Sequence, residues 1–273
     1  MPSPRKHHLV AFGLAGALLF SAAACGSSDS GSDGGSKGSE GGSGESAATW
    51  KVCSDMPYEP FEFEGEGPRG LAYTGFDIEL LDAIAEDQGA TLDITDSDFD
   101  TIFASVNAGN CDIVASAVTI TPEREKNTLF SEPYFDADQS LLVPADSDVK
   151  SLDDLAGETI GVQTGTTGES YANENKPEGA TIKAYPDAAA LFAALNSGEI
   201  AGILQDLPVN SDRATKDENV TVVETFKTGE QYGFAFAKDN TELQGEVDKG
   251  LAAVKDDGTY DEIYQKYFPN AGN

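Results

Sequence analysis

The segment Thr119–Arg124, with the sequence TITPER, has residue types suited to binding an anion. Thr121 is a favourable N-cap and Pro122 a favourable first helical residue, so we expect a helix to begin here. Arg124 would then lie in the first helical turn, where the helix dipole disfavours a cation and an anion must compensate. A guanidinium beside free N–H groups can hold a carboxylate through two parallel hydrogen bonds. The alternative is a salt bridge between Arg124 and one of the chain's many acids.

Two further segments follow predicted strands and carry groups suited to a polar ligand. Residues 161–169 are rich in Gly and Thr, and small residues let backbone N–H groups approach an anion. The Lys-Ser/Thr of a nucleotide-binding P-loop is absent, and a plain turn between a strand and a helix fits equally well. Asp206 ends a buried strand, where its carboxylate can hold an ammonium group. A turn or N-cap role before Pro208 is the alternative.

A third segment combines a carboxylate with an aromatic ring. Asp55 and Tyr58 share the loop after the first predicted strand, and Phe99 supplies a second ring from the sequence DFD. A carboxylate with rings nearby suits a polar or cationic group. Taken singly, each aromatic residue is more often part of a hydrophobic core.

Histidine-based catalysis is excluded if the N-terminus is removed. His7 and His8 precede an apolar run, and its cleavage leaves no histidine for a Ser-His-Asp triad, a Cys-His pair or a metal site. The chain has 17 Lys and Arg against 48 Asp and Glu, which gives a net charge of −31. A protein this acidic does not bind nucleic acid through its phosphates, and we interpret the charge as a source of solubility.

The N-terminus has the design of a secretory signal peptide, which we place at residues 1–24. A basic segment, Arg5–His8, precedes the 16-residue apolar run Leu9–Ala24, which is short for a membrane span of about 20 residues. The run ends in the sequence AAAC, similar to a bacterial lipobox, so we expect Cys25 to be lipidated. Ala22 stands where Leu is usual, which leaves ordinary cleavage as the alternative.

Residues 25–48 form a tether after this segment. Positions 26–46 contain 8 Gly and 8 Ser but no apolar residue, so we expect a flexible connection between the lipidated cysteine and a folded domain. Two more cysteines follow, Cys53 and Cys111. In an extracytoplasmic setting they suggest a disulfide, and two separately buried thiols are the alternative.

Beyond Trp50 the apolar pattern alternates between short strands and helices, which predicts parallel sheets with helical crossovers. The predicted helices are 76–87, 101–107, 167–173, 188–196, 243–255 and 260–267. The predicted strands are 50–54, 91–94, 112–116, 141–143, 159–163, 182–184, 200–204 and 231–237. A short internal repeat relates residues 103–114 to residues 192–203, each with a helix, a Gly stop and a buried strand. Two such units suggest two similar lobes with a cleft between them.

The chain resembles the family 3 extracellular solute-binding proteins, which are polar amino-acid-binding proteins of ABC importers. The resemblance rests on the lipobox and, in order, on the segments 55–63, 75–80 (GFDIEL), 98–100, 119–124, 165–167 and 205–206. It covers Trp50 to Phe268.

The family has an α/β fold with two lobes, the type II periplasmic-binding-protein-like fold. The resemblance therefore implies two parallel-rich sheets joined by two hinge crossovers that close on a ligand. Lobe 1 is expected at 49–137 plus 235–273 and lobe 2 at 138–234, with the crossovers near Asp136–Gln139 and Gln231–Ala235.

By this resemblance, two charged residues hold the two ends of an amino acid. Arg124 takes the α-carboxylate, helped by the backbone of Thr119 and Thr167. Asp206 takes the α-ammonium, helped by Thr119 and by the backbone of Ser116–Ala117.

The ligand's side chain is expected between Tyr58 and Phe99, with Asp55 at its polar end. Family members for basic amino acids often carry two consecutive serines where this chain has Ser116–Ala117, which removes one hydroxyl. Members for acidic ligands need extra basic residues in the cleft, and the only candidate, Arg69, lies in a predicted hairpin loop. The carboxylate with two rings favours arginine or lysine, with glutamine next.

The resemblance implies an extracytoplasmic receptor, lipid-anchored to the cell membrane, that closes on an amino acid and delivers it to a membrane permease. It further implies a monomer that uses no cofactor or metal and breaks no bond. One alternative is a periplasmic dehydratase on the same fold, with Glu59, Glu62 or Glu169 as general acid, although the pairing of Arg124 with Asp206 argues against it. The other alternative is a ligand-sensing subunit of a signalling receptor.

Overall fold

Two five-stranded sheets carry the folded part of the chain. The structure, a computed structural model, describes residues 47–269. The predicted signal peptide, the lipidation site at Cys25 and most of the tether lie outside these residues. The first sheet contains, in spatial order, β4 (Ala90–Asp96), β1 (Ala48–Ser54), β5 (Ile113–Val114), β12 (Ala235–Ala237) and β6 (Thr128–Phe130). Its first three strands are parallel, and β12 pairs antiparallel with both β5 and β6.

The second sheet repeats this mixture of directions. It contains, in spatial order, β11 (Val220–Tyr232), β7 (Phe135–Pro144), β10 (Gly202–Asp206), β8 (Thr159–Gln163) and β9 (Thr181–Tyr185). The last three strands are parallel, whereas β7 is antiparallel to both β11 and β10. In each sheet, two pairs of neighbouring strands are parallel and two are antiparallel. Both sheets are therefore mixed, whereas the sequence predicted mostly parallel sheets. The antiparallel strands are those next to the passages between the sheets.

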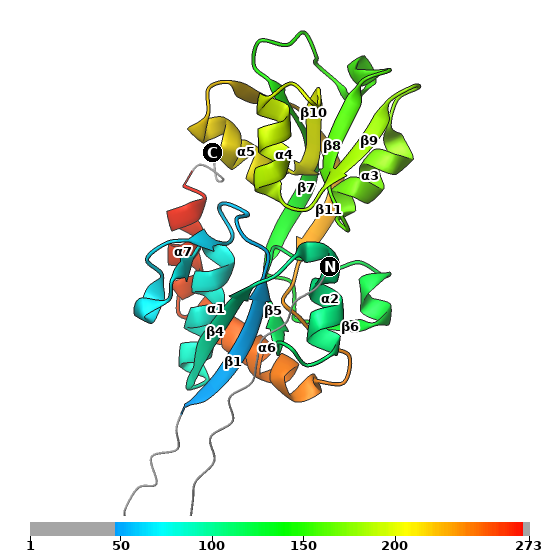
Figure 1. Ribbon diagram of the computed structural model, residues 1–273. Coiled ribbons are helices and arrows are strands. Elements are labelled where there is room, and N and C mark those ends of the chain that lie inside the picture. Colours follow the sequence, from blue (N-terminus) through cyan, green and yellow to red (C-terminus); the bar gives the residue numbers. More distant parts are fainter. Residues whose placement is uncertain (1–46, 270–273) are drawn as a thin grey trace, which may run out of the picture. The chain divides into compact units, whose positions relative to one another are not determined.

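Helices pack with each sheet (Figure 1). Those of the first sheet are α1 (Phe76–Asp87), α2 (Phe99–Asn107), α6 (Thr241–Asp256) and α7 (Thr259–Tyr267). Those of the second sheet are α3 (Thr167–Asn175), α4 (Ala188–Asn196) and α5 (Leu207–Lys216). We call the first sheet with its helices lobe 1 and the second with its helices lobe 2. Within residues 47–269, no helix has the length and apolar character needed to span a membrane.

A small hairpin of β2 (Phe63–Glu64) and β3 (Tyr73–Thr74) precedes α1. Arg69 lies in its loop, as predicted, and forms an ion pair with Asp82 of α1 at a shortest distance of 2.5 Å. The guanidinium of Arg69 is therefore engaged by α1. Short 3-10 helices occur at Pro68–Gly70, in the loop of this hairpin, at Arg124–Lys126 and at Leu152–Leu155.

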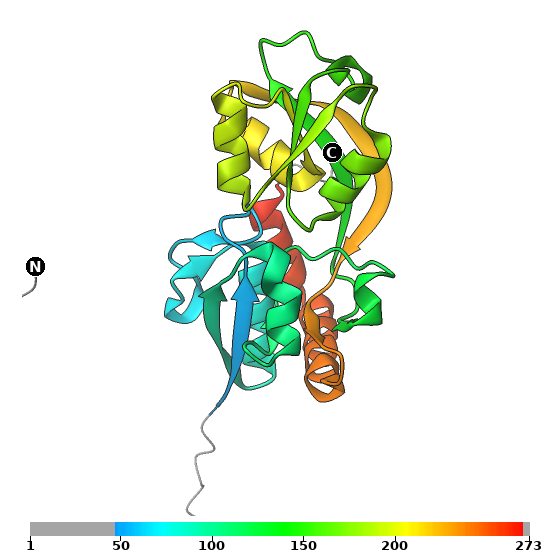
Figure 2. The same cartoon turned by 45° about the vertical axis from the view of Figure 1, so that its right-hand side comes forward.

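The chain passes twice between the two sheets. β6 ends at Phe130 and β7 begins at Phe135, while β11 ends at Tyr232 and β12 begins at Ala235. Figure 2 shows β7 in green and β11 in orange beside these passages, where the two strands pair with each other. The single strand predicted over residues 231–237 is wrong, because the chain changes sheets in its middle.

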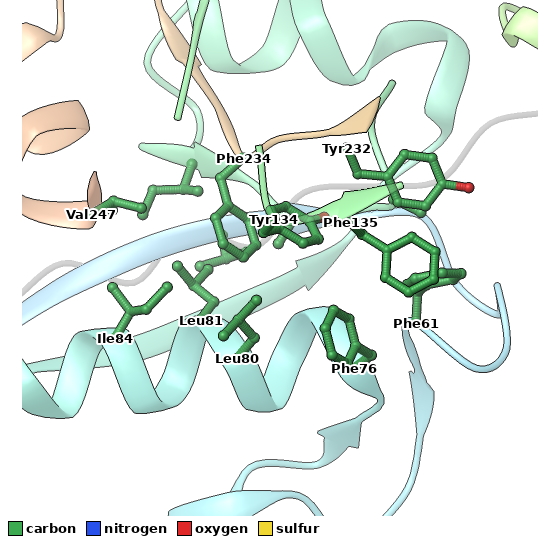
Figure 3. Close-up of a cluster of buried hydrophobic side chains, with 14 of the residues drawn as sticks. Phe61, Phe76, Leu80, Leu81, Ile84, Tyr134, Phe135, Tyr232, Phe234 and Val247 are labelled. Carbon is green, nitrogen blue, oxygen red and sulfur yellow. The ribbon is translucent and has the colours of Figure 1, made fainter. Parts of the chain in front are cut away.

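Aromatic side chains fill the core of lobe 1 next to the passages (Figure 3). Phe61 packs edge-on against Phe76, Phe135 and Tyr232, with ring centres 6.1, 5.0 and 5.2 Å away. All four rings are buried. Edge-to-face pairs of this kind add to the stability gained from burial alone. The cluster therefore anchors the start of β7, where the chain leaves lobe 1, and the end of β11, where it returns to lobe 1.

The internal repeat corresponds to two equivalent units, one in each lobe. α2 leads into β5, and α4 leads into β10. Gly109 and Gly198 follow these helices with the same φ of 74°. Glycine adopts this left-handed conformation at little cost, which explains why each helix stops where it does. The predicted helices at 76–87 and 188–196 are confirmed residue for residue.

A disulfide ties β1 to the segment that leads into β5. Cys53 and Cys111 are bonded, with their Cα atoms 5.8 Å apart. Both residues are also buried in the core. The bond therefore ties the carboxyl end of β1 to the residues just before the neighbouring strand β5.

Candidate functional site

One pocket gathers side chains from both lobes. Its empty volume is about 290 Å³, near the lower end of pockets that hold small molecules, which run from roughly 300 to 1,000 Å³. The lining residues are Asp55, Tyr58, Phe99, Ser116, Ala117, Thr119, Arg124, Gln163, Thr166, Thr167 and Asp206. The structure thus brings together all nine positions that the family resemblance selected. Gln163 and Thr166 are additional.

Arg124 lies in the short 3-10 helix Arg124–Lys126, so the helix predicted here is not an α-helix. Thr121 Oγ1 accepts a hydrogen bond from Arg124 N at 3.2 Å. The residue directly before this helix is Glu123, however, and its side chain makes no capping hydrogen bond, so Thr121 is not the N-cap that the sequence predicted. The next strand, β6, begins at Thr128 and leaves no room for further helical turns. A helix dipole therefore gives no reason to expect a bound anion here, and that expectation depends on the guanidinium of Arg124 alone.

Carbonyl groups from both lobes hold the guanidinium of Arg124. Its Nη1 donates to Thr119 O at 2.7 Å, and its Nη2 donates to Gly165 O at 3.1 Å. Its central carbon lies 5.3 Å from the ring centre of Phe99 and 4.9 Å from that of Phe103. No carboxylate within residues 47–269 forms an ion pair with it.

The charge of Arg124 persists at neutral pH. Burial lowers the pKa of its guanidinium to about 10, opposed by the negative charges of Asp206 and Glu230. A cation that faces a pocket and pairs with no described carboxylate is well placed to receive an anionic group of a ligand.

Asp206 ends β10 and is buried. Gln139 Nε2 donates to its Oδ1 at 2.6 Å, and the hydroxyl of Tyr232 donates to its Oδ2. Although Asp206 precedes α5, its side chain makes no capping hydrogen bond, so the N-cap alternative is not observed. Burial raises its pKa to about 6, and the nearby charge of Glu230 contributes. A bound cation would relieve both effects.

Asp55 is the second buried carboxylate of the pocket. Its backbone N–H donates to Ser116 Oγ at 3.0 Å, and its Oδ2 accepts a hydrogen bond from Gln163 Nε2 at 2.5 Å. Within residues 47–269 no basic side chain forms an ion pair with it. Burial raises its pKa to about 7, and the negative charge of Asp96 adds to the shift. Gln163, which the sequence analysis did not select, bridges the two lobes here.

Ser116 and Ala117 follow β5 and line the pocket. Ala117 has a φ of 45°, a left-handed conformation that is uncommon for a residue other than glycine. Its N–H donates to Asp77 Oδ2 at 2.8 Å, and Ser116 Oγ donates to Glu62 Oε1 at 2.9 Å. Two buried acidic side chains thus hold this part of the pocket wall from behind.

Glu230 is a further carboxylate beside the pocket. Its Oε2 accepts hydrogen bonds from Thr119 Oγ1 at 3.0 Å and from Thr167 Oγ1 at 2.8 Å. Thr119 belongs to lobe 1, whereas Thr167 begins α3 of lobe 2, so Glu230 connects both sides. Sequence reasoning missed it because β11, the strand that carries it, was not predicted over this part of the chain.

The three acids considered as catalytic groups lie outside the pocket lining. Glu59 forms an ion pair with Lys216 at 2.5 Å. Glu169 accepts a hydrogen bond from a backbone N–H at 2.7 Å. Glu62 is fully buried behind the pocket wall. None of the three therefore faces the space where a substrate would lie.

Comparisons with known proteins agree with this fold. The family described as "Bacterial extracellular solute-binding proteins, family 3" matches residues 50–270. The chain is 33% identical over 233 residues to the "Putative ABC transporter arginine-binding protein 2" of Escherichia coli (strain K12), covering 83% of this chain and 93% of that protein.

Two solved structures have closely similar folds. One is described as an ancestral arginine-binding protein bound to arginine, with a TM-score of 0.74 and 35% identity over 82% of this chain and 99% of that chain. The other is described as an ancestral arginine-binding protein bound to glutamine, with a TM-score of 0.73 and 37% identity over 81% of this chain and 98% of that chain. The two-lobe fold predicted from the sequence is confirmed.

Proposed function

Because the chain belongs to family 3 of the bacterial extracellular solute-binding proteins, we propose that it captures a polar amino acid outside the cell membrane and delivers it to the permease of an ABC importer. It is a solute-binding protein and not an enzyme. The relatives support an amino acid as the ligand, since one carries the name of an arginine-binding protein and two similar structures hold arginine or glutamine.

Arg124 and Asp206 hold the backbone of the amino acid in this proposal. The guanidinium of Arg124 receives the α-carboxylate, with the backbone of Thr119 and Thr167 beside it. The carboxylate of Asp206 receives the α-ammonium, with Thr119 and the Ser116–Ala117 backbone beside it. The carboxylate of Asp206 is buried and the guanidinium of Arg124 is half-buried. Neither forms an ion pair with an opposite charge among the described residues, so a zwitterion supplies the charge that each lacks.

The charge of Asp55 is the observation that favours a basic amino acid. A zwitterion neutralises Arg124 and Asp206, which leaves the buried carboxylate of Asp55 without a cation. Arginine or lysine provides that cation, with the rings of Tyr58 and Phe99 along its aliphatic chain. Glutamine ranks next, because its amide can donate to Asp55. Glutamate is disfavoured, because its side-chain carboxylate would lie beside the negative carboxylate of Asp55.

Capture in this proposal is a shift toward the closed arrangement of the lobes. Arg124 belongs to lobe 1 and Asp206 to lobe 2, so a ligand contacts both only when they are closed. The permease then recognises the closed form. Lipidation of Cys25 holds the monomeric receptor at the membrane, and the glycine-rich tether gives it reach.

Replacing Asp55 with asparagine should weaken the binding of basic amino acids but not that of neutral ones. The change removes the charge and keeps the shape, so we expect the affinity for arginine to fall at least tenfold, about 1.4 kcal/mol. The affinity for glutamine should stay within about threefold, because an amide can still accept its hydrogen bond. Isothermal titration calorimetry measures both constants.

The matched control for this change is Asp98→Asn. Asp98 is exposed, does not line the pocket, and contributes the smallest of the three neighbouring negative charges that raise the pKa of Asp55. Its replacement should leave both affinities within about threefold. An equal loss of arginine and glutamine binding in Asp55→Asn would overturn the cation assignment. Failure of the unmodified protein to bind any amino acid would overturn the proposed function itself.

As pH falls below about 7, the affinity for arginine should fall more steeply than the affinity for glutamine. Burial raises the pKa of Asp55 to about 7, so the free protein is protonated there at lower pH, whereas a guanidinium requires the ionised form. The affinity for arginine then falls by up to about tenfold per pH unit. Asp206, with a pKa of about 6, affects both ligands equally, since both carry an α-ammonium. Titrations between about pH 6 and pH 8 test this, and a constant ratio of the two affinities would refute it.

A further inference from the structure

Two carboxyl groups lie fully buried directly behind the pocket wall. Glu62 forms a bridge with Tyr58 just before the small hairpin, and Asp77 lies in the first turn of α1. Both side chains have 0% of their residue surface exposed. No Lys or Arg within residues 47–269 forms an ion pair with either of them. Two buried carboxylates without a cation are very unfavourable unless protons or hydrogen bonds compensate.

Only one oxygen of each carboxyl group has a hydrogen-bond partner. Glu62 Oε1 accepts from Ser116 Oγ at 2.9 Å. Asp77 Oδ2 accepts from Ala117 N at 2.8 Å and from the hydroxyl of Tyr134 at 2.6 Å. The other two oxygens, Glu62 Oε2 and Asp77 Oδ1, are buried without any hydrogen-bond partner. Because the partners Ser116 and Ala117 are consecutive, the two carboxyl groups lie against the same short stretch of backbone.

The groups around this pair are also acidic. Asp55 and Asp206 act on Glu62 from the pocket side, and Asp77 acts on it more strongly than either. The phenols of Tyr58, Tyr134 and Tyr260 face the pair from the loop after β1, from the passage into β7 and from α7. Phenols can donate hydrogen bonds, but they carry no positive charge. The surroundings therefore supply three hydrogen-bond donors to the pair but no positive charge among the described residues.

We propose that Glu62 and Asp77 share one proton, that Glu62 carries it and donates it to Asp77 Oδ1, and that this bond positions Ser116 and Ala117 in the pocket wall. A single proton provides a partner for both of the unpartnered oxygens. The negative charge resides on Asp77, because its other oxygen accepts two hydrogen bonds, whereas that of Glu62 accepts one. Burial, followed by the charge of Asp77, raises the pKa of Glu62 well above its usual range, in agreement with this arrangement.

The shared proton connects the core of lobe 1 to both parts of the proposed ligand site. Ser116 Oγ donates to Glu62 and also accepts from the backbone N–H of Asp55, so Glu62 influences where Asp55 lies. Asp77 holds the N–H of Ala117 in its left-handed conformation. Glu62 and Asp77 are therefore positioning residues, since neither lines the pocket. Their effect on binding rests on the proposed function, whereas the shared proton does not.

Infrared spectroscopy detects the proton without requiring a ligand. A protonated carboxyl group has a carbonyl stretch that a carboxylate lacks. The band should persist at about pH 8, where Asp55 and Asp206, with pKa values of about 7 and about 6, are ionised. It should disappear in Glu62→Gln and remain in Glu59→Gln, a matched control at the surface whose carboxylate pairs with a lysine. Absence of the band in the unmodified chain at that pH would refute the proposal without any variant having to fold.

The pH dependence of stability gives a second test. An unfolded Glu has a pKa of about 4.3, and the raised value in the fold means that the folded state holds one proton more above that pH. Stability from this proton is therefore complete below about pH 4.3 and is lost as pH rises toward the folded pKa. The unfolding constant of the unmodified chain should rise relative to that of Glu62→Gln by up to tenfold per pH unit. Identical pH profiles for the two proteins would contradict the proposal.

Ligand affinity tests the positioning role separately. Glu62→Leu removes the acceptor for Ser116 and the donor for Asp77, so amino-acid affinity should fall at least tenfold. Glu62→Gln supplies an oxygen for Ser116 and an N–H for Asp77, and it should restore most of that loss. Equal affinities in the two variants would refute positioning. A further outcome is an infrared band that is present although neither the unmodified protein nor any variant binds an amino acid. That result would refute the proposed function but would leave the shared proton supported.

Discussion

Replacing Arg124 with alanine should abolish useful amino-acid binding and leave the fold intact. The guanidinium is the only basic group in the pocket lining, and removing one partner of a buried charge pair costs about 2–5 kcal/mol. That range corresponds to a loss of affinity of about thirtyfold or more. Within residues 47–269 the guanidinium of Arg124 donates only to two carbonyl oxygens and packs on two rings, so its loss should change the melting temperature little.

Lys126→Ala is the matched control, because Lys126 belongs to the same short helix and pairs with Glu123 on the surface. Its replacement should leave the affinity unchanged. Arg124→Lys should bind with intermediate affinity, since an ammonium keeps the charge but cannot form two parallel hydrogen bonds. A fall of less than tenfold in Arg124→Ala, measured by calorimetry, would show that the α-carboxylate is held elsewhere.

The second large effect is expected for Asp206→Asn. The change keeps the shape of the side chain and removes the charge that the α-ammonium needs. Affinity for arginine and for glutamine should fall together, again by about thirtyfold or more. This common loss distinguishes Asp206 from Asp55, whose replacement should affect arginine alone.

A ligand that lacks the α-ammonium group tests directly whether Asp206 binds that group. The deamino analogue of arginine should bind the unmodified protein weakly, and Asp206→Asn should weaken it little further, because the partner of the carboxylate is already missing. Asp212→Asn, on the surface of α5 where Asp212 pairs with Lys216, is the matched control. If the analogue lost as much affinity as arginine does in Asp206→Asn, the carboxylate would not be the ammonium partner.

The parts of the fold with strong apolar periodicity were predictable from the sequence. α1 combines regularly spaced apolar residues with a glycine stop at Gly89, and both its ends were predicted correctly. α5 was missed because it follows Asp206 without a linker, contains Pro208 and buries only Val209 and Asn210. A helix with so small a buried face leaves little periodic signal.

The strands next to the passages were the least predictable. β11 runs for 13 residues, most of them half-buried or exposed, so its pattern resembles that of a polar loop. Its pairing with β7 stabilises it through contacts distant in the sequence. The crossover predicted near 136–139 consequently falls inside β7, whose 10 residues were recognised only at 141–143.

The positions of the candidate site were predictable even where the local structure was not. Arg124 lines the pocket although the predicted α-helix is a short 3-10 helix, because its place follows from the motif and not from the helix. Gln163 ends a strand that was predicted correctly, yet nothing in its own neighbourhood indicated that it reaches Asp55 across the pocket. Sequence reasoning gave neither Glu62 nor Asp77 a supporting role behind the pocket wall, since only the fold shows that both are buried.

The central claim is that this pocket binds a basic amino acid, and a thermal-shift panel tests it most directly. The chain from Glu45 to Asn273, which includes both lobes, would be refolded to remove carried-over ligand and tested with arginine, lysine, glutamine, glutamate and cystine. A ligand at about 100 times its dissociation constant adds about 2.7 kcal/mol, which raises the melting temperature by several degrees. We predict such a shift with arginine or lysine and none with glutamate. No shift with any amino acid would contradict the account.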